Sequence, residues 1–453
     1  MNKSFYIRTY GCQMNLLDSQ LATGILSEVG YLPTDDPSRA QVILVNTCAV
    51  REHAEQRALG RIRDLLRYKD RGHQVKLVVM GCMAQRLGKE LFKLAPGVDI
   101  VAGPDSYREL PRFLEDLNHS PIASLAINPR ESYAGVCAHR RKEVCAFVSV
   151  MRGCNNFCSF CIVPWVRGRE RSRPPQEIAA EVRVLVTQGF KEVTLLGQNV
   201  NSYRWRQDDF SSLLWRLNEI EGIERIRFTT SHPRDLSLKL LEAIREAEKV
   251  CEHLHLPLQS GSDDILKRMN RGYTLRDYLG LVESARRLIP DLVLTTDIIT
   301  GFPGEREEDF QKTVEVMERV SFDSSFTFKY SPRPGTKAAE FADDVPFDVK
   351  SKRLTALIQL QRRITDEKNR ALVGTTREVL VERSGKMAGQ LYGRTRTNKP
   401  VVFPAQKGET GKTLKLKIVK AKGWTLFGEP LNQAISSGGS VSRDQEKSVP
   451  TEN

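Results

Sequence analysis

The sequence lacks any long run of apolar residues. Its apolar segments are short, and one of the longest, Val75–Met80, contains a lysine. None approaches the roughly 18 residues that cross a bilayer as a helix. The first residues, MNKSFYIRTYGC, contain no apolar signal-peptide core. We therefore expect a protein that is neither exported nor membrane-bound and that works in the cytoplasm.

The composition also lacks the extremes of disordered chains, collagen-like repeats and small disulfide scaffolds. Hydrophobic residues make up 40% of the 453 residues and charged residues 28%, with 31 Gly and 21 Pro. At about 150 residues per domain, this length predicts about three domains. In a protein that is not exported, the 9 cysteines are expected as thiols, metal ligands or redox groups and not as disulfides.

Acidic residues are in the minority. The chain has 56 Asp and Glu against 69 Lys and Arg, which gives a net charge of +13. Such an excess favours a polyanionic partner such as a nucleic acid. More than half of the excess lies between Leu372 and Leu431, so the C-terminal region is the predicted contact with that partner.

Residues 1–118 alternate between strand-like and helix-like segments, which predicts a doubly wound parallel α/β sheet. The strand-like segments are Phe5–Thr9, Val42–Val45 and Leu77–Met80, and the amphipathic segments between them are Asp18–Val29 and Ala54–Arg67. A cysteine closely follows each strand: Cys12, Cys48 and Cys82. The carboxyl ends of parallel strands share one edge of a sheet, so the three thiols are expected to converge there. They form either a metal site or part of a buried core.

Residues 119–145 show no period and are predicted to be a linker. Residues 146–370 contain six strand-like segments that alternate with helical ones, which predicts a partial (β/α)6 barrel whose working face is built by the loops after the strands. The six segments are Ala146–Met151, Glu192–Leu196, Arg225–Thr229, His253–Leu258, Leu292–Ile299 and Ser325–Tyr330.

Residues 372–433 carry short β-like runs and predict a small basic β-barrel. The tail 436–453 is predicted to be disordered.

The sequence MRGCNNFCSFC places Cys154, Cys158 and Cys161 in one loop after the first strand of the predicted (β/α)6 barrel. Three close thiolates can hold three irons of a 4Fe–4S cluster, where four protein thiolates are usual, so one iron stays open for another ligand. The alternatives are a structural zinc site, which more often uses paired CxxC motifs, and unligated thiols.

This loop resembles the signature of the radical SAM superfamily, including an aromatic residue, Phe160, between the last two cysteines. Further segments resemble the tRNA methylthiotransferases, and in particular the branch that acts on isopentenyladenosine, over about residues 3–433. These segments are GCQMN at Gly11, NTCAVRE at Asn46, GCMAQR at Gly81, LGQNVNSY at Leu196, TTSHPRD at Thr229, HLPLQSGS at His255 and GFPGE at Gly301. The basic C-terminal module resembles a TRAM domain, an RNA-binding β-barrel.

The resemblance implies two 4Fe–4S clusters and S-adenosylmethionine (SAM) as cofactors. Cys154, Cys158 and Cys161 match the ligands of the radical SAM cluster, and Cys12, Cys48 and Cys82 those of an auxiliary cluster. Gln198, Asn199, Gln259 and Ser260 follow strands of the predicted (β/α)6 barrel and are candidate cofactor contacts. The implied reaction is 2-methylthiolation of isopentenyladenosine next to the anticodon of tRNA by a monomer, with an electron-donor protein and a sulfur source.

Two alternative functions remain open. A related methylthiotransferase would act on threonylcarbamoyladenosine or on a ribosomal-protein aspartate. A non-catalytic RNA-binding protein would instead hold structural zinc.

Several basic residues have two interpretations. Arg167, Arg169, Arg171 and Arg173 follow the cysteine loop and would contact phosphates or pair with neighbouring carboxylates. Arg394, Arg396 and Lys399, near Tyr392, are predicted to contact RNA. His232 is predicted to be structural or orienting, and Cys251 to belong to the core.

Overall fold

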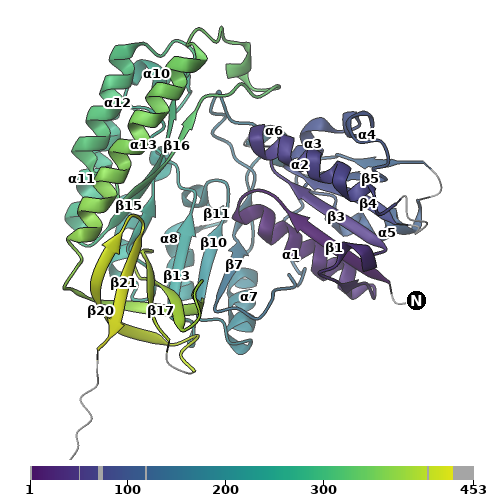
Figure 1. Cartoon of the computed structure of the whole chain (residues 1–453), viewed down its shortest axis with the longest axis horizontal. Coiled ribbons are helices and arrows are strands. Elements are labelled where there is room, and N and C mark those ends of the chain that lie inside the picture. The colour runs from purple at the N-terminus through teal and green to yellow at the C-terminus, as the bar shows by residue number, and fades with distance from the viewer. Residues whose placement is uncertain (1–2, 50–51, 70–74, 118–119, 406–407, 432–453) are drawn as a thin grey trace, which may run out of the picture.

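The structure is a computed structural model that describes residues 3–49, 52–69, 75–117, 120–405 and 408–431 (Figure 1). The predicted disordered tail, 436–453, lies outside the described residues. Three units follow one another along the chain: a parallel α/β sheet, a partial (β/α)6 barrel and a small closed β-barrel. Within the described ranges, no helix combines the length and the apolar character needed to cross a bilayer.

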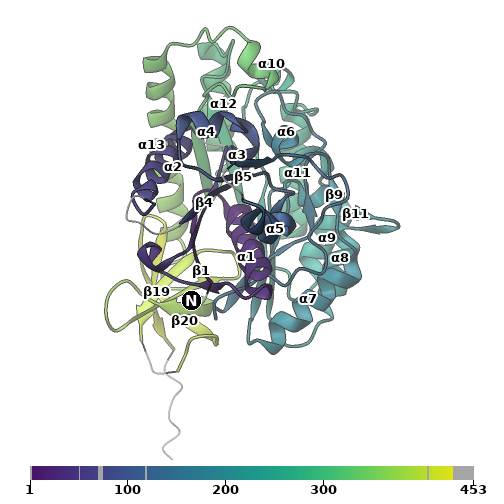
Figure 2. The ribbon, with the colours of Figure 1, turned by 90° about the vertical axis from the view of Figure 1, so that its right-hand side faces the viewer.

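The N-terminal unit is a six-stranded sheet with the order β2-β1-β3-β4-β5-β6, in which all neighbours are parallel. Its strands are β1 (Ser4–Thr9), β2 (Leu32–Pro33), β3 (Val42–Thr47), β4 (Lys76–Gly81), β5 (Ile100–Ala102) and β6 (Ile122–Ser124). Its helices are α1 (Gln13–Glu28), α2 (Glu52–Leu66), α3 (Cys82–Leu87), α4 (Glu90–Leu94) and α5 (Leu110–Glu115). Figure 2 shows this sheet in front of the (β/α)6 barrel.

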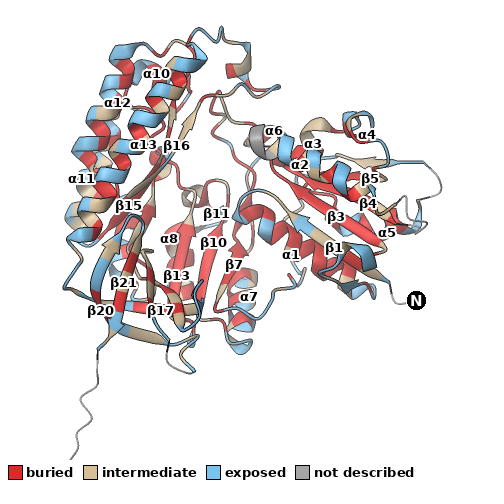
Figure 3. Ribbon diagram, in the orientation of Figure 1, coloured by how far each residue is buried: buried red, intermediate tan, exposed pale blue. Residues whose placement is uncertain are grey.

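Alternate residues of the central strands pack on opposite faces of this sheet. Val78 and Met80 of β4 join the core formed with α1 and α5, whereas Leu77 and Val79 join the core formed with α2, α3 and α4. Strands covered on both faces are buried along their whole length, as β3 is in Figure 3. The predicted doubly wound sheet is therefore confirmed.

The prediction of a plain linker over 119–145 was wrong in one part. β6 lies inside this segment and pairs with β5 as the edge strand of the sheet. Tyr133 of the same segment is 2% exposed and packs in the sheet core. A strand of three residues is too short to show a period of two, which is why the pattern did not reveal it.

The second unit carries the six predicted parallel strands. They are β7 (Cys145–Ser149), β10 (Glu192–Leu196), β13 (Arg225–Thr229), β14 (His253–His255), β15 (Val293–Thr300) and β16 (Ser324–Lys329). Two three-stranded sheets, β7-β10-β13 and β14-β15-β16, are joined by a bridge between Ile226 and Val250. The outer helices are α7 (Pro175–Thr187), α8 (Phe210–Asn218), α9 (Leu238–Glu246), α11 (Leu275–Leu288), α12 (Glu307–Val320) and the closing α13 (Phe347–Arg370).

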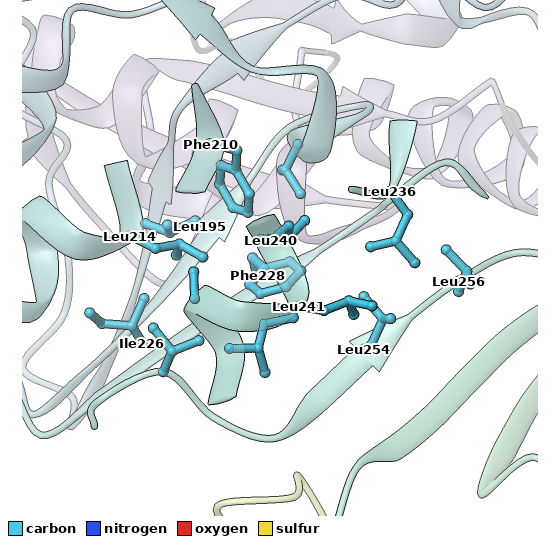
Figure 4. Close-up of a cluster of buried hydrophobic side chains, with 14 of the residues drawn as sticks. Leu195, Phe210, Leu214, Ile226, Phe228, Leu236, Leu240, Leu241, Leu254 and Leu256 are labelled. Carbon is cyan, nitrogen blue, oxygen red and sulfur yellow. The ribbon is translucent and has the colours of Figure 1, made fainter. Parts of the chain in front are cut away.

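Shorter elements lie in the connections that follow the carboxyl ends of β7, β10 and β14. They are the strands β8 (Met151–Arg152), β9 (Arg171–Ser172), β11 (Arg204–Trp205) and β12 (Asp208–Asp209) and the helices α6 (Val163–Arg167) and α10 (Asp263–Arg268). The core lies between strands and helices, where Leu195, Ile226 and Phe228 meet Phe210 and Leu214 of α8 (Figure 4). A tightly filled outer layer of this kind holds the strand ends in fixed positions.

The third unit is a closed barrel with the order β17-β18-β19-β21-β20. Its strands are β17 (Thr376–Ser384), β18 (Gln390–Thr395), β19 (Pro400–Pro404), β20 (Thr413–Lys422) and β21 (Thr425–Pro430). Alternate residues such as Val379, Val381, Leu416 and Ile418 fill its interior. The predicted small β-barrel is confirmed.

The small barrel covers the amino-terminal ends of the (β/α)6 strands. Arg394 donates from Nη2 to Oε1 of Glu192 at 2.7 Å, where β10 begins. Arg396 pairs with Glu252 at 2.6 Å, and Lys399 pairs with Asp323 at 3.1 Å. These ion pairs leave the opposite, carboxyl ends of the strands free for a functional site.

This contact corrects the prediction that Arg394, Arg396 and Lys399 bind RNA. The three cations form ion pairs with carboxylates of the (β/α)6 barrel. The ring centroid of Tyr392 lies 4.3 Å from the guanidinium carbon of Arg383. The basic residues that remain exposed on this unit include Lys415, Lys417, Lys420 and Lys422 of β20.

Candidate active site

The cysteine loop, Cys154–Cys161, begins directly after β8. Gly153 has φ +80°, and a Cβ there would lie 2.0 Å from the carbonyl oxygen of Arg169, so only glycine fits. The side chain of Gln198 accepts a hydrogen bond at 2.6 Å from the backbone N–H of Gly153. Gln198, a candidate cofactor contact, therefore supports the start of the loop from the end of β10.

The second set of cysteines, Cys12, Cys48 and Cys82, lies at the carboxyl edge of the N-terminal sheet, and we call these the sheet-edge cysteines. Cys12 follows β1, Cys48 follows β3 and Cys82 begins α3 directly after β4. β1 lies between β2 and β3, so the strand order reverses there, and ligands of open α/β sheets bind at such a point. A Cβ on Gly81 would lie 2.4 Å from Oδ1 of Asn46, so the approach to Cys82 also requires glycine.

Helix α6, which follows the cysteine loop, contacts one of the sheet-edge cysteines. It starts two residues after Cys161, and its Val166, together with Ile162, packs against Cys82 and Ala49. Arg167 at the end of α6 donates from Nε to Sγ of Cys82 at 3.2 Å. The segment that follows the cysteine loop therefore reaches a cysteine of the other unit.

A buried ion cluster surrounds this contact. Asp18 of α1 accepts from Arg152 at 2.9 Å and from Arg167 at 2.6 Å, and none of the three side chains is more than 3% exposed. Burial raises the pKa of the Asp18 carboxyl, but the two guanidinium groups outweigh burial and hold this pKa below its usual value. Two positive charges against one negative charge leave one positive charge in excess beside Cys82.

The cysteine loop also has a buried guanidinium. Arg271 is 4% exposed and donates to Sγ of Cys158 at 3.2 Å, to the carbonyl of Pro257 at 2.9 Å and to the hydroxyl of Tyr273 at 3.0 Å. Among the described residues, no carboxylate lies within 4.0 Å of its nitrogens. This site, too, holds one positive charge that no carboxylate balances.

Within the part of the chain that the structure describes, no three side chains of His, Cys, Asp or Glu stand close enough to hold a single metal ion. The thiolates of a 4Fe–4S cluster bind different irons, so they do not need to meet at one point. Burial raises the pKa of Cys154 to about 11 and that of Cys161 to about 12, so these thiols are protonated until a cation or cluster binds them.

Five buried polar side-chain atoms beside the cysteine loop have no hydrogen-bond partner among the described residues. They are Nδ2 of Asn156, Oδ1 of Asn199, Oγ of Ser231, Nε2 of His232 and Oε1 of Gln259. Asn156 lies in the cysteine loop and the others follow β10, β13 and β14, at the carboxyl ends of the strands. Buried polar atoms without partners are costly, so this set indicates a place for a polar ligand.

His232 contributes a hydrogen-bond donor to this set. Its Nδ1 accepts from the backbone N–H of Arg234 at 3.2 Å, so the ring proton belongs on Nε2. Burial, together with the charges of Arg271 and Arg234, lowers the pKa of His232 to about 2, which keeps the ring neutral. The side chain thus caps the turn Pro233–Asp235 and also presents an unused N–H group.

The other candidate cofactor contacts have different surroundings. Asn199 donates to Asp235 at 2.6 Å and keeps its oxygen unpaired. Gln259 has φ +76°, a conformation that is uncommon outside glycine and often marks a functional position. Ser260 is fully buried and accepts from the backbone N–H of Ser262, so it supports the turn.

The inner face of β14, β15 and β16 carries a polar pair and an exposed aromatic ring. Leu254 and Leu294 pack outward in the helix-covered core, so the alternate residues face inward. Nε2 of His255 lies 3.5 Å from Oδ2 of Asp297, and its ring centroid lies 6.4 Å from that of Phe326. Phe326 is 57% exposed, which leaves an open aromatic surface.

The basic run after the cysteine loop pairs with neighbouring carboxylates at three of its four positions. Arg167 reaches Asp18, Arg171 donates to Asp105 at 2.6 Å, and Arg173 donates to Glu181 at 2.8 Å. Arg169 is exposed, and its guanidinium lies 4.1 Å from the ring centroid of Phe157. Of the two interpretations of this run, pairing with neighbouring carboxylates is therefore confirmed for Arg167, Arg171 and Arg173.

Each of the three units of the chain matches a known protein family. Residues 148–317 match the radical SAM superfamily, residues 4–103 match the uncharacterised protein family UPF0004, and residues 370–431 match the TRAM domain.

Curated relatives cover almost the whole chain. The tRNA-2-methylthio-N(6)-dimethylallyladenosine synthase of Caldicellulosiruptor saccharolyticus is 48% identical over 94% of this chain and 92% of its own length. The enzymes of the same name from Thermoanaerobacter pseudethanolicus and Clostridium botulinum (strain Hall) are 47% and 45% identical, again over 94% of this chain, and over 93% and 97% of their own lengths.

Solved structures show the same fold at low identity. The radical S-adenosylmethionine methyltransferase TsrM from Kitasatospora setae, with cobalamin and a [4Fe-4S] cluster bound, superposes with a TM-score of 0.58 at 16% identity and covers 75% of this chain and 77% of its own. The cobalamin-dependent S-adenosylmethionine radical enzyme OxsB has a TM-score of 0.53 at 11% identity and covers 80% of this chain and 56% of its own.

Proposed function

The chain belongs to the tRNA-2-methylthio-N(6)-dimethylallyladenosine synthase family, and from this we propose that it attaches a methylthio group to carbon 2 of N(6)-isopentenyladenosine beside the tRNA anticodon. It is a radical SAM enzyme with a tRNA substrate, and the superfamily implies one 4Fe–4S cluster and SAM. The electron-donor protein, the sulfur source and the monomeric state remain predictions.

Carbon 2 of adenine carries an unactivated C–H bond that acid–base side chains cannot break. A 4Fe–4S cluster with an open iron and bound SAM supplies the deoxyadenosyl radical for such a bond. Cys154, Cys158 and Cys161 are the residues that hold this cluster in our proposal. Gln198 and Gly153 hold the start of the loop that carries the three thiols.

The main support for a second cluster is the unbalanced positive charge that is buried beside each set of cysteines. The oxidised 4Fe–4S core has two positive charges, and three thiolates make the whole group singly negative. One unbalanced guanidinium charge lies beside Cys82 and one beside Cys158. An unbalanced buried charge is strongly destabilising, so a singly negative group at each position fits the charges present. We therefore assign an auxiliary cluster to Cys12, Cys48 and Cys82.

We assign SAM to the unpaired polar atoms above the (β/α)6 strands. Asn199, His232 and Gln259 offer one N–H donor and two oxygen acceptors there. The amino and carboxylate groups and the ribose hydroxyls of SAM are of complementary polarity. The adenine of tRNA is assigned to the inner face near Phe326, where an unstacked base can lie on the exposed ring.

The decisive experiment counts iron and acid-labile sulfide in protein reconstituted without air. The wild type should hold about eight irons, and about four each should remain in a C154A/C158A/C161A variant and in a C12A/C48A/C82A variant. Cys137→Ala is the matched control, because this exposed cysteine lies outside both sets. A wild type with about four irons would contradict the auxiliary cluster.

The same variants separate the roles of the two sites. The loop variant should not cleave SAM, whereas the sheet-edge variant should cleave some SAM without forming methylthio product. Mass spectrometry of an isopentenylated anticodon stem-loop and of a threonylcarbamoylated one reports the substrate. Product on the second RNA alone would replace the proposed substrate, and bound zinc without iron would indicate the RNA-binding alternative.

A further inference from the structure

A groove of about 450 Å³ opens beside the cysteine loop. It is lined by Ile127, Pro129, Phe157, Pro164, Trp165 and the segment 168–171. Its walls thus come from the segment before β7, from the cysteine loop and from α6. The radical reaction described above uses none of its exposed side chains.

Two phenylalanines of the loop pack in different directions. Phe160 packs against the buried cluster that contains Phe302 and Tyr330, whereas Phe157 meets Trp165 edge to face at 6.3 Å in the groove. Phe157 directly precedes Cys158, so the groove wall is one residue from a proposed cluster ligand.

The surface around the groove is aromatic and basic. Trp165 is 58% exposed, although it belongs to a helix whose other apolar residues are buried or half-buried. Arg169 lies over Phe157. Two more exposed arginines are close in the chain or by backbone contact: Arg130 follows the lining residue Pro129, and the backbone N–H of Arg204 donates to Ser172, which follows the lining residue Arg171. Among the described residues, no carboxylate lies within 4.0 Å of these three guanidinium groups.

One acidic residue also lines the groove. Glu170 turns toward the cysteine loop, where its Oε1 accepts from the backbone N–H of Asn155 at 3.1 Å. Its carboxylate is thus engaged within the chain, and the groove keeps a basic rim around an aromatic centre. This combination complements a small acidic protein surface.

We propose that this groove is where an acidic, low-potential electron-carrier protein docks and delivers its electron to the cysteine loop. The inference rests on the proposed function, because it requires a cluster at Cys154, Cys158 and Cys161. The carrier loses one electron and the oxidised cluster gains it, and no atom or proton is transferred. Contacts of this kind are small and transient, which suits a groove of this size.

The test compares two reductants on the reconstituted enzyme. Reduced flavodoxin serves as the acidic protein probe and dithionite as a small chemical reductant. The test variants are Trp165→Ala and Arg169→Glu. Trp215→Ala on α8 and Arg183→Glu on α7 are matched controls, because both are exposed residues outside the groove. Stopped-flow absorbance gives the rate of flavin oxidation, and SAM cleavage is measured with each reductant.

With flavodoxin, both test variants should lose about tenfold or more in electron-transfer rate, and Arg169→Glu should also weaken the dependence of that rate on salt. With dithionite, SAM cleavage should remain at the wild-type level in all four variants. Flavodoxin rates within roughly twofold of wild type in both test variants would overturn the proposal.

RNA binding at the groove and loss of the cluster would each give a distinct result. Weaker binding of an anticodon stem-loop by Trp165→Ala and Arg169→Glu, with unchanged flavodoxin rates, would assign the groove to RNA and overturn docking of a carrier. A wild-type protein without iron would fail at the reconstitution step, which tests the proposed function and not the groove.

Discussion

Single buried polar groups carry much of the chemistry at the residue scale. His232 is one of them, with a neutral ring and an Nε2–H group that no described residue accepts. Asp18, Arg152 and Arg271 are others, because each is buried and charged. Such groups are costly in an apolar interior, so each one indicates a partner that completes it.

His232→Phe should weaken SAM binding by roughly 1.5–3 kcal/mol, because the ring loses a donor to a charged or polar ligand group. Calorimetry on the cluster-loaded protein measures this affinity. The pKa of His232 is lowered to about 2, so the ring stays neutral from pH 5 to pH 8 and should add no pH dependence there. His139→Phe, in the segment before β7, is the control, and equal losses in both variants would contradict the assignment.

Sequence motifs predicted the six cysteines but not their charged neighbours. The cysteines stand in short motifs with a fixed spacing, so a local pattern is enough to find them. Asp18 and Arg152 are 134 residues apart, and Arg271 and Cys158 are 113 apart. A pairing over such distances leaves no local pattern, so only the folded chain reveals it.

At the scale of helices and strands, short connecting segments position the cysteines of the candidate active site. Each sheet-edge cysteine follows a strand, and α6 joins the cysteine loop to Cys82. The contacts of the basic run, Arg167–Arg173, are also set at this scale. The pairing of β8 with β9 places Arg171 and Arg173 against carboxylates of other elements. Linear sequence showed the charges, whereas the short hairpin decides which of them reach solvent.

Gly153→Ala should lose the iron of the cysteine loop and keep that of the sheet-edge cysteines. The added Cβ would lie 2.0 Å from the backbone oxygen of Arg169, which forces the loop to move. Gly189→Ala is the matched control for a positive φ alone, since a Cβ there meets nothing within 4 Å. Iron analysis with SAM-cleavage assays checks this, and a Gly153→Ala protein with wild-type iron would show that the loop tolerates the shift.

At the scale of the whole molecule, the units are joined by buried ion pairs. Arg394 and Arg227 both bind Glu192 where the small barrel covers the base of the (β/α)6 barrel. Composition predicted a basic RNA-binding module, but it could not show which of its cations form ion pairs with the (β/α)6 barrel. The class of each unit was predictable from hydrophobic patterns, whereas the strand orders and the contacts between units were not.

Exchanging Lys415 and Lys417 for Glu should weaken tRNA binding several-fold and reduce its salt dependence, because these exposed lysines of β20 can meet phosphates. Arg394→Met should instead lower the melting temperature, because it leaves buried Glu192 with one partner fewer; breaking a buried pair costs about 3–5 kcal/mol. Filter binding at two salt concentrations and thermal unfolding distinguish the two effects. A loss of tRNA affinity in folded Arg394→Met alone would restore the first interpretation of this residue.

The pairing of Asp18 with Arg167 also sets an order of events during synthesis. The two residues are 149 positions apart, so Asp18 leaves the ribosome well before its partner. At about 5–20 residues per second, the delay is roughly 7–30 seconds. β6 ends at Ser124, so 43 residues separate the completed N-terminal sheet from Arg167, and for about 2–9 seconds the cysteine-bearing edge of that sheet faces water because α6 has not been made. Cys82, which packs against Ile162 and Val166 in the complete fold, therefore stays uncovered until α6 is made.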